Sequence, residues 1–415
     1  MVRRRLCCAR RLSRFRHARL GSDPQCPSRR LAARRASLPR KSKRCACAPP
    51  CRAISGYLNG TALVHDYLNQ RGGAERVFAQ IARAFPDAPI YTALYDPSVT
   101  GDLFRGRTIN VSPLGKLPAV NRYFRALAPL YPAVFEAFDF SGYDTIVSST
   151  TAWAKGVRVP AGAIHVSYVN TVSRFIFAYD EYTRGFALRD LARPIVGQLA
   201  RWDREAAQRP TRLIANSRNV AARIRAHYGR DAEVLHCPVE LDRFTVGAGA
   251  GDYFFIASRL LPYKRIEIAI DACDAAGVPL LIAGSGPAEA ALQRHARGTT
   301  TSLLGFIDDR RLNALLGNAR AAIVPGEEDF GLAPLEAAAS GTPTIALRAG
   351  GALETIREHE TGEFFDQPAS AALQQAIARF DRSRYDPQAL RRHAETFSPA
   401  AFTERLRQLV ADAPR

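Results

Sequence analysis

The chain has 415 residues, 47% of them hydrophobic, which is enough for two domains with separate cores. Its formal charge of +19 is concentrated at one end, because residues 1–52 contain 17 lysines and arginines but a single acidic residue, Asp23. Beyond residue 52 there are 41 basic and 38 acidic side chains, so the composition argues against nucleic acid as a partner of the folded body.

The basic segment, residues 1–55, is predicted to be a disordered leader. The spacing of Cys45, Cys47 and Cys51 lacks the paired C-x2-C pattern of a structural zinc site. The segment has no apolar core of a secretory signal, although its arginine-rich character resembles a transit peptide. Because Met1 is the only methionine, we interpret the leader as a start assigned upstream of the true one. The remainder has no apolar run of about 18 residues that could span a membrane, and we expect a cytoplasmic protein.

Residues 56–230 are predicted to form a first Rossmann-like domain. An apolar strand over residues 61–64 is followed by a turn containing Gly72 and Gly73, and then by a helix whose apolar positions repeat every 3.6 residues. This order of strand, glycine turn and helix opens a doubly wound α/β domain. The other strands predicted for this domain cover residues 145–148, 163–169 and 213–215.

Residues 231–390 are predicted to form a second domain of the same α/β class. Its five predicted strands cover residues 253–257, 280–283, 302–304, 321–324 and 343–346. Each is followed by a glycine-containing loop or a helix, which is typical of a parallel sheet with helical crossovers. The linker between the domains is placed at residues 234–244.

The segment from Glu328 to Glu336, EDFGLAPLE, follows the strand predicted over residues 321–324. Pro334 favours the first turn of a helix, which places Glu328 in the preceding loop and Glu336 in that turn. The amides of Leu332 and Ala333 would then be free to bind phosphate, and the carboxylates to accept hydrogen bonds from sugar hydroxyls. An equally weighted alternative is a helix whose dipole is balanced by nearby acids.

A second segment, SRLLPYKR over residues 258–265, follows the strand predicted over residues 253–257. Ligands of open α/β sheets bind at the carboxyl ends of strands. Arg259 and Lys264 could therefore hold a diphosphate and neutralise it as it leaves. Two basic residues in a loop are more often solvated surface, and it is their occurrence with Glu328 and Glu336 in one domain that favours a site.

These motifs resemble those of family-4 glycosyltransferases, and specifically bacterial mannosyltransferase-like enzymes of surface-polysaccharide assembly. Glu328 and Glu336 fit the family's E-x7-E pattern, and Arg259 and Lys264 fit its R-x4-K pattern. The resemblance extends over residues 62–409. It implies a GT-B fold, with two Rossmann-like domains facing a cleft and a C-terminal helix, within residues 391–415, that returns to the first domain.

The resemblance also implies roles for individual residues. Glu328, Arg259, Lys264 and Asn170 are the candidate catalytic residues, with Glu328 at the donor sugar and no metal ion required. The implied substrate-binding residues are Gly72, Gly73, Arg174, Phe306, Gly331, Leu332, Ala333 and Glu336. Among these, Glu336 would contact the ribose, the Gly72–Gly73 turn the far side of the diphosphate, and the Phe306 loop the base.

The chain departs from the family at the cleft. Members of this branch typically have Y-x-H-T-P-x-R, whereas this chain has Tyr168-Val-Asn-Thr-Val-Ser-Arg174. Asn170 therefore stands where the family has a histidine, and asparagine carries no charge near neutral pH. The predicted activity is retaining transfer of a hexose, mannose favoured, from a nucleotide sugar to a lipid-linked or polysaccharide acceptor. The alternative is a non-catalytic nucleotide-sugar-binding subunit.

The donor is expected to be GDP-mannose or a UDP-hexose, with no other cofactor. Residues 113–138 combine apolar side chains with Lys116, Arg122 and Arg125. This pattern fits an apolar face resting on anionic lipid at the inner face of the membrane. An ordinary amphipathic helix packed on the domain is a somewhat better supported interpretation.

Overall fold

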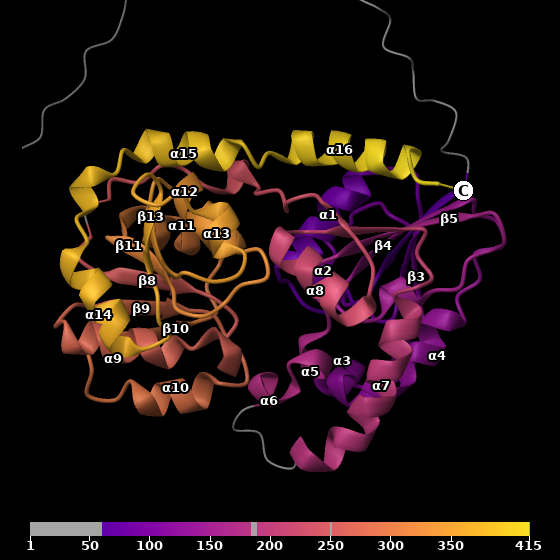
Figure 1. The fold of residues 1–415 in the computed structure, drawn as a ribbon, viewed down its shortest axis with the longest axis horizontal. Coiled ribbons are helices and arrows are strands. Elements are labelled where there is room, and N and C mark those ends of the chain that lie inside the picture. The colour runs from indigo at the N-terminus through magenta and orange to yellow at the C-terminus, as the bar shows by residue number, and fades with distance from the viewer. Residues whose placement is uncertain (1–59, 184–188, 250, 415) are drawn as a thin grey trace, which may run out of the picture. The chain divides into compact units, whose positions relative to one another are not determined.

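The computed structural model describes residues 60–183, 189–249 and 251–414 (Figure 1). The predicted leader over residues 1–55, including Cys45, Cys47 and Cys51, lies outside the described residues. In the described part of the chain, no helix combines the length and the apolar character needed to cross a membrane.

The first domain is built on a sheet of seven parallel strands in the order β3-β2-β1-β4-β5-β6-β7. The strands are β1 Thr61–His65, β2 Ile90–Thr92, β3 Ile109–Val111, β4 Thr145–Thr150, β5 Ile164–Val169, β6 Arg212–Ala215 and β7 Glu233–Val234. The α-helices are α1 Gly73–Ala84, α2 Pro97–Thr100, α3 Val120–Tyr123, α4 Tyr131–Glu136, α5 Arg174–Phe177, α6 Tyr179–Tyr182, α7 Arg193–Ala206 and α8 Arg218–Tyr228. The 3-10 helices are η1 Pro113–Lys116, η2 Phe124–Leu130, η3 Ala154–Gly156 and η4 Arg189–Ala192.

The second domain has a sheet of six parallel strands in the order β10-β9-β8-β11-β12-β13. The strands are β8 Phe254–Ala257, β9 Leu280–Ala283, β10 Thr301–Gly305, β11 Ala321–Val324, β12 Thr344–Leu347 and β13 Gly362–Phe365. The helices are η5 Leu241–Arg243, η6 Pro262–Lys264, α9 Ile266–Ala275, α10 Glu289–His295, α11 Asp309–Asn318, α12 Leu332–Ala339, α13 Ala352–Thr355, α14 Ser370–Arg379, η7 Arg382–Arg384, α15 Pro387–Glu395 and α16 Pro399–Ala411.

Both sheets are doubly wound, and each has its switch of direction beside its first strand. In the first domain the order reverses between β1 and β4, and in the second between β8 and β11. All residues of β1, β4, β5, β11 and β12 are buried, as expected for parallel strands with helices on both faces. The loops after these strands therefore open at the two positions where doubly wound sheets bind ligands.

The chain returns to the first domain at its end. Helix α15 packs against α12 of the second domain, and α16 packs against α1 of the first (Figure 1). Phe402 of α16 is buried with its ring edge-to-face on Tyr168 of β5, at a centroid distance of 5.7 Å. Arg407 Nε donates a hydrogen bond to the carbonyl oxygen of Ala84, at 2.9 Å. The returning C-terminal helix predicted from the sequence is confirmed.

The strands expected from the sequence are present, and four more are found. Three of these, β2, β3 and β7, belong to the first sheet, so it continues past the domain boundary expected at residue 230. The fourth, β13, brings the second sheet to six strands rather than the predicted five. These strands have two to four residues, and β7 is exposed, so they lack the continuous apolar run on which the predictions relied.

Residues 113–138 do not form one amphipathic helix. They fold into η1, α3, η2 and α4, and Pro113, Pro129 and Pro132 lie within three of these short elements. Proline removes a backbone donor and clashes with the preceding turn, so a continuous helix cannot form here. The apolar residues are divided between the core and the surface, which the single-helix interpretation did not anticipate.

The Phe402–Tyr168 contact predicts that α16 is part of the folded first domain. We expect Phe402→Ala to lower the free energy of unfolding by about 3–5 kcal/mol, because it removes a buried ring and leaves a cavity. The measurement is urea unfolding followed by circular dichroism. Glu404→Ala, on the exposed face of the same helix, serves as the control, with a change within about 0.5 kcal/mol. Equal effects of the two substitutions would contradict this packing.

Candidate functional site

The N-terminus of α12 borders a pocket lined by Lys264, Glu328 and Ala333. Its N-cap residue, Gly331, has a φ of 92°, a left-handed conformation that favours glycine, and no side chain caps the helix. Among the described residues, the amides of Leu332 and Ala333 have no hydrogen-bond partner. Two unpaired amides and the positive end of the helix dipole make this end suited to an anion.

The N-terminus of α1 faces the same place from the first domain. Gly72 is the N-cap of α1, and its amide donates to the Glu75 carboxylate at 2.8 Å. A Cβ atom added to Gly73 would lie 3.1 Å from Cδ1 of Leu332, which shows how closely the two helix ends approach. The structure therefore brings the predicted Gly72–Gly73 turn together with the predicted α12 amides.

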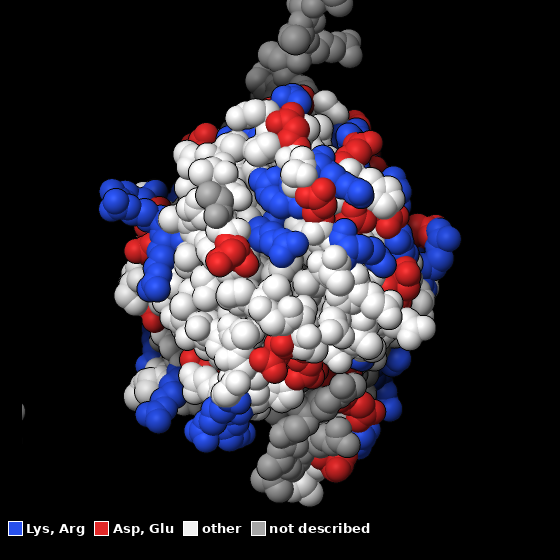
Figure 2. Space-filling model, turned by 90° about the vertical axis from the view of Figure 1, so that its left-hand side faces the viewer, with Lys and Arg blue, Asp and Glu red and all other residues white. Residues whose placement is uncertain are grey.

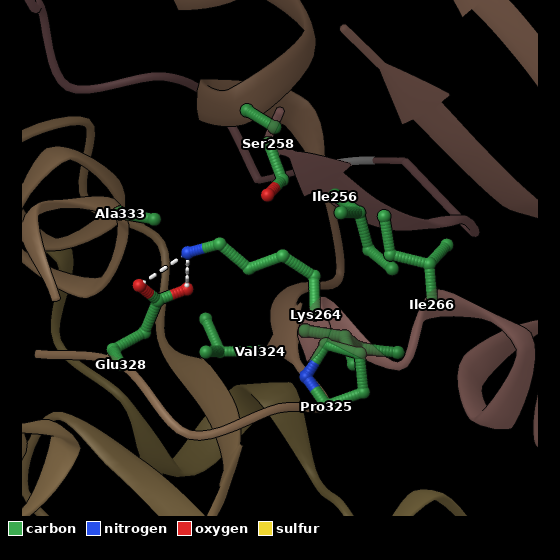
Figure 3. A pocket seen from close by; sticks show the side chains of 10 residues that line it. Ile256, Ser258, Lys264, Ile266, Val324, Pro325, Glu328 and Ala333 are labelled. Atoms are coloured by element: carbon green, nitrogen blue, oxygen red, sulfur yellow. Dashed lines mark hydrogen bonds and ion pairs between the residues drawn. The ribbon is translucent and has the colours of Figure 1, made fainter. Parts of the chain in front are cut away.

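A lysine–glutamate pair lies beside the α12 N-terminus (Figure 3). Lys264 ends η6, which follows β8, and its ammonium group contacts both carboxylate oxygens of Glu328 in the loop after β11. Burial alone would lower the pKa of Lys264, but the charges of Glu328 and Asp329 and the contact with Tyr263 raise it above 10.5. Lys264 is therefore a permanent cation in a pocket also lined by Ala333.

Arg259 lies on the same loop as Lys264, nearer its start. It is exposed, and within the described ranges no carboxylate forms an ion pair with it. Its charge adds to burial in lowering the pKa of Arg125, which belongs to the first domain. An arginine without an acidic partner at the end of a strand is available to a ligand anion.

Glu336 is the fifth residue of α12, so the prediction that it lies in the first turn is wrong. The helix begins at Leu332, so Pro334, its third residue, does lie in the first turn as predicted. The Glu336 carboxylate accepts a hydrogen bond from Arg243 Nη1 at 3.2 Å. Burial raises its pKa above 4.5, and the charge of Arg243 opposes this shift.

Phe306 follows β10 and is 77% exposed. An exposed aromatic ring at the end of a strand of this sheet is compatible with the expected contact to a base, which stays a prediction. Asp309, three residues further on, binds Arg243 at 2.8 Å and Arg76 of α1 at 3.1 Å. The loop after β10 is thereby tied both to the first domain and to the arginine that contacts Glu336.

Asn170 is buried at the carboxyl end of β5. Its side-chain nitrogen donates to Ser149 Oγ at 3.0 Å and to the carbonyl oxygen of Thr150 at 3.3 Å. The main-chain carbonyl oxygen of Asn170 accepts a hydrogen bond from the side-chain amide of Asn216 at 2.8 Å. Within the part of the chain that is described, its Oδ1 atom has no partner, which leaves that atom to accept a hydrogen bond from a ligand.

Arg174, predicted to bind substrate, is occupied by a carboxylate of the opposite domain. Its Nε and Nη2 atoms donate to Asp329 at 3.0 and 2.9 Å. Burial alone would lower the pKa of Arg174, but the charges of Asp329, Tyr263 and Glu328 raise it. Because Asp329 directly follows Glu328 in the chain, this ion pair brings Arg174 close to Glu328.

The sequence reasoning missed three buried carboxylates that shape the site. Asp66 follows β1 and accepts hydrogen bonds from four consecutive amides after β4, those of Thr151, Ala152, Trp153 and Ala154. Asp203 binds the ammonium of Lys155 at 2.6 Å and the hydroxyls of Tyr228 and Ser173. Glu354 accepts hydrogen bonds from the amides of Arg218 and Asn219 and contacts His236.

Only Glu354 could have been recognised from the sequence. It ends the segment GGALE, residues 350–354, and Ser217 is recognisable as the N-cap of the helix whose first two amides bind it. Asp66 and Asp203 bind groups that are distant in the sequence, so nothing in the local pattern points to their partners.

Two family models match the chain. "Glycosyltransferase Family 4" matches residues 71–243, and "Glycosyl transferases group 1" matches residues 240–397. A GDP-mannose-dependent alpha-(1-6)-phosphatidylinositol dimannoside mannosyltransferase of Mycobacterium tuberculosis is 36% identical over 194 residues, which is 44% of this chain and 45% of that protein. A human alpha-1,3/1,6-mannosyltransferase is 35% identical over 115 residues, which is 26% of this chain and 27% of that protein. The chain spans about half the length, or less, of these curated relatives.

Solved structures resemble the chain over most of its length. Sucrose-phosphate synthase of Thermosynechococcus elongatus has a TM-score of 0.67 at 20% identity, over 85% of this chain and 98% of that one. HepE of Anabaena, solved with UDP and glucose, has a TM-score of 0.63 at 17% identity, over 85% of this chain and 99% of that one. At these identities the likeness shows the fold alone, and it confirms the predicted two-domain GT-B architecture.

The position of Glu354 predicts a pH-dependent contribution to stability. Burial tends to raise its pKa, but hydrogen bonds from His236 and from the Arg218 and Asn219 amides lower it below 4.5. A lowered folded-state pKa stabilises the protein above the unfolded value, and this stability is lost as the pH falls through the folded value.

We therefore expect Glu354→Gln to lower the free energy of unfolding at pH 7 by about 1–3 kcal/mol. The amide would place an N–H group against a backbone donor. The difference from the wild type should shrink as the pH falls below 4.5. Urea unfolding at a series of pH values measures it, with the exposed Glu404→Gln as control. A difference that does not change with pH would contradict the assignment.

Proposed function

Because the chain belongs to the family-4 glycosyltransferases, we propose that it transfers a hexose, mannose favoured, from a nucleoside diphosphate sugar, with retention of anomeric configuration. The observation that carries this proposal is the Lys264–Glu328 pair beside the N-terminus of α12, which itself lies against the N-terminus of α1. This arrangement offers amides and a cation to a diphosphate and a carboxylate to a sugar.

Different residues of the second domain bind different parts of the donor. The amides of Leu332 and Ala333, with Lys264 and Arg259, bind the diphosphate and stabilise the charge that develops as it leaves. Glu328 accepts hydrogen bonds from sugar hydroxyls. The remaining donor contacts are Gly331 at the diphosphate, Glu336 at the ribose and the Phe306 loop at the base.

The first domain provides the acceptor side. The turn at Gly72 and Gly73 closes over the far side of the diphosphate, and Asn170 offers Oδ1 to a sugar hydroxyl. In the reaction, the bond between the anomeric carbon and the phosphate oxygen breaks, and its electron pair passes to the diphosphate. The acceptor hydroxyl forms the new bond on the same face, and its proton passes to the leaving phosphate. Lys264 and Arg259 supply the positive charge for which a metal ion would otherwise be needed.

The nucleotide base of the proposed donor is inferred from the relatives of the chain. The mycobacterial relative is named as GDP-mannose-dependent, which supports GDP-mannose, and the HepE structure with UDP and glucose supports a UDP-hexose as the second choice. A lipid-linked or polysaccharide acceptor follows from the resemblance to enzymes of surface-polysaccharide assembly. Nucleic acid is not expected as a partner, since basic and acidic side chains are interspersed on the face shown in Figure 2.

The second candidate function is a subunit that binds a nucleotide sugar without turnover. It is favoured by Asn170, because an asparagine cannot supply the charge or the proton transfer of the family's histidine. The two functions differ in whether bound donor is consumed.

We also propose that the first domain rests on an anionic membrane surface at the inner face of the cytoplasmic membrane. Apolar side chains from two separate segments are exposed on this domain: Leu117, Tyr123, Leu130, Leu191 and Ile195. A groove lined by Pro129, Pro132, Ile195, Gln198, Leu199 and Trp202 joins η2 and α4 to α7. Lys116, Arg122 and Arg125 lie on the first of these segments, residues 113–138, which suits anionic lipid.

The full-length chain should bind one nucleotide sugar and release its nucleoside diphosphate. The donors to compare are GDP-mannose, UDP-glucose, UDP-galactose and UDP-N-acetylglucosamine, with nucleotide release followed in the presence of acceptor extract. Glu328→Ala should lower the rate by about a hundredfold or more, because it removes a group that contacts the reacting sugar. Glu404→Ala, on the exposed face of α16, should have no effect. Binding without release, also in Asn170→His, would favour the non-catalytic subunit, and no binding would exclude both functions.

The membrane proposal predicts binding to vesicles that contain anionic phospholipid and weaker binding to neutral phosphatidylcholine vesicles. Replacing Leu130 and Leu191 by serine should weaken binding about tenfold, because two exposed leucines lose their transfer to lipid. Val234→Ser, an exposed position on β7, is the control. Vesicle co-sedimentation measures the effect, and equal binding by the leucine variant and the control would contradict this surface.

A further inference from the structure

The loop of Glu327, Glu328 and Asp329 is held by the first domain at several points. Arg174 binds Asp329 through two hydrogen bonds, and Arg223 of α8 binds Asp329 at 2.8 Å and Glu327 at 2.7 Å. The main chain of the loop is also held by hydrogen bonds. Ser217 Oγ donates to the carbonyl oxygen of Asp329 at 2.7 Å, and Asn219 Nδ2 donates to the carbonyl oxygen of Glu328 at 3.2 Å. The first domain thus fixes the residues around the Glu328 carboxylate without touching that carboxylate.

The second domain holds the same loop from the other side. The amide of Gly351 donates to the carbonyl oxygen of Glu328 at 2.9 Å, and Gly350 pairs with Glu328 in an isolated parallel bridge. A Cβ atom at Gly351 would lie 2.3 Å from backbone atoms of Phe330, so only glycine fits there. The backbone of Glu328 is therefore fixed, and the placement of its carboxylate depends on the charges near it.

Arg174 lies close to both members of the Lys264–Glu328 pair. Its guanidinium binds Asp329, the residue after Glu328, and stacks at 4.7 Å on the ring of Tyr263, the residue before Lys264. Its side chain is 7% exposed and that of Asp329 is 18% exposed. A buried arginine fork at this position interacts strongly with any carboxylate it can reach.

Arg174 and Lys264 are therefore competitors for Glu328. The charge of Glu328 contributes to the raised pKa of both cations, which shows that each is within its influence. Asp329 occupies the fork of Arg174 and leaves the Glu328 carboxylate to Lys264. Without the negative charge of Asp329, the fork of Arg174 would still be attracted by the charge of Glu328, which already contributes to its raised pKa.

We propose that Asp329 is a positioning residue, which holds Arg174 and Arg223 across the cleft and thereby keeps Glu328 directed at Lys264 and the donor sugar. This inference rests on the proposed function. It assigns Arg174 to the placement of Glu328 rather than to direct contact with substrate. Because both arginines belong to the first domain, the placement of Glu328 depends in part on contacts between the two domains.

The test compares Asp329→Asn with the wild type on the donor identified in the screen. Asparagine keeps the size of the side chain and removes its charge. We expect kcat to fall about tenfold to a hundredfold, because the reacting carboxylate is displaced. The Kd for the nucleoside diphosphate, measured by calorimetry, should change less than about threefold, because the α12 amides, Lys264 and Arg259 remain. Arg174→Lys, which keeps the charge but loses the fork, should behave in the same way.

Glu358→Gln is the matched control. Glu358 also accepts a bidentate pair from an arginine, Arg348, at 2.8 and 2.5 Å, and its change has the same effect on net charge. Its kcat should equal that of the wild type, and thermal unfolding should show all variants folded. If Asp329→Asn does not fold, Arg174→Lys and Arg223→Gln carry the test.

Three results would overturn the inference: an unchanged kcat in the variants, an equal loss of kcat and of nucleotide affinity, or a loss of kcat in Glu358→Gln as well. Failure of the proposed function would give a different result, because the wild type itself would then release no nucleotide from any donor.

Discussion

The cleft depends on how three consecutive carboxylates are neutralised. Glu327, Glu328 and Asp329 follow one another in a single loop, where like charges repel, and each has a different arrangement of cations. Arg223 forms an ion pair with Glu327, and Lys264 forms one with Glu328. Asp329 forms ion pairs with both Arg174 and Arg223. Only the cation of Glu328 comes from the same domain. Cations of the first domain therefore balance the charges of Glu327 and Asp329, which makes the electrostatics of the site a property of both domains.

The doubly wound topology explains why the charges gather here. In both domains the switch of strand order lies beside the first strand. The segment after β1 approaches the segment after β11, where Gly73 lies against Leu332. Two helix N-termini, those of α1 and α12, add their positive ends at the same place. In the proposed function, an anion at this point binds main-chain groups of both domains. The arginines and Lys264 then decide how its charge is balanced.

The sequence predicted the parts of the site that are local and missed those that join distant segments. Glu328 and Lys264 could be placed because each follows a recognisable buried strand by a few residues. Glu336 was placed one turn too early, since the N-cap is a glycine in a left-handed conformation, not the Ser, Thr or Asp that usually marks a helix start. The bond between Arg174 and Asp329 spans 155 residues, and neither local pattern contains information about the other. The short strands β2, β3, β7 and β13 were missed for a related reason, because neighbouring strands define them more than their own residues do.

The geometry of Asn170 bears on whether this site turns over its donor. Its side-chain nitrogen joins β4 to β5, so the residue stabilises the carboxyl edge of the sheet at the cleft. Its Oδ1 can still accept a hydrogen bond, which is the contact a sugar hydroxyl requires. What asparagine lacks is a second ionisation state, and a reaction in which the leaving phosphate takes the acceptor's proton has no need of one. The substitution then affects how firmly the sugar is held more than whether the bond can break. On this argument the charge balance around Glu328 is more important for turnover than Asn170 is.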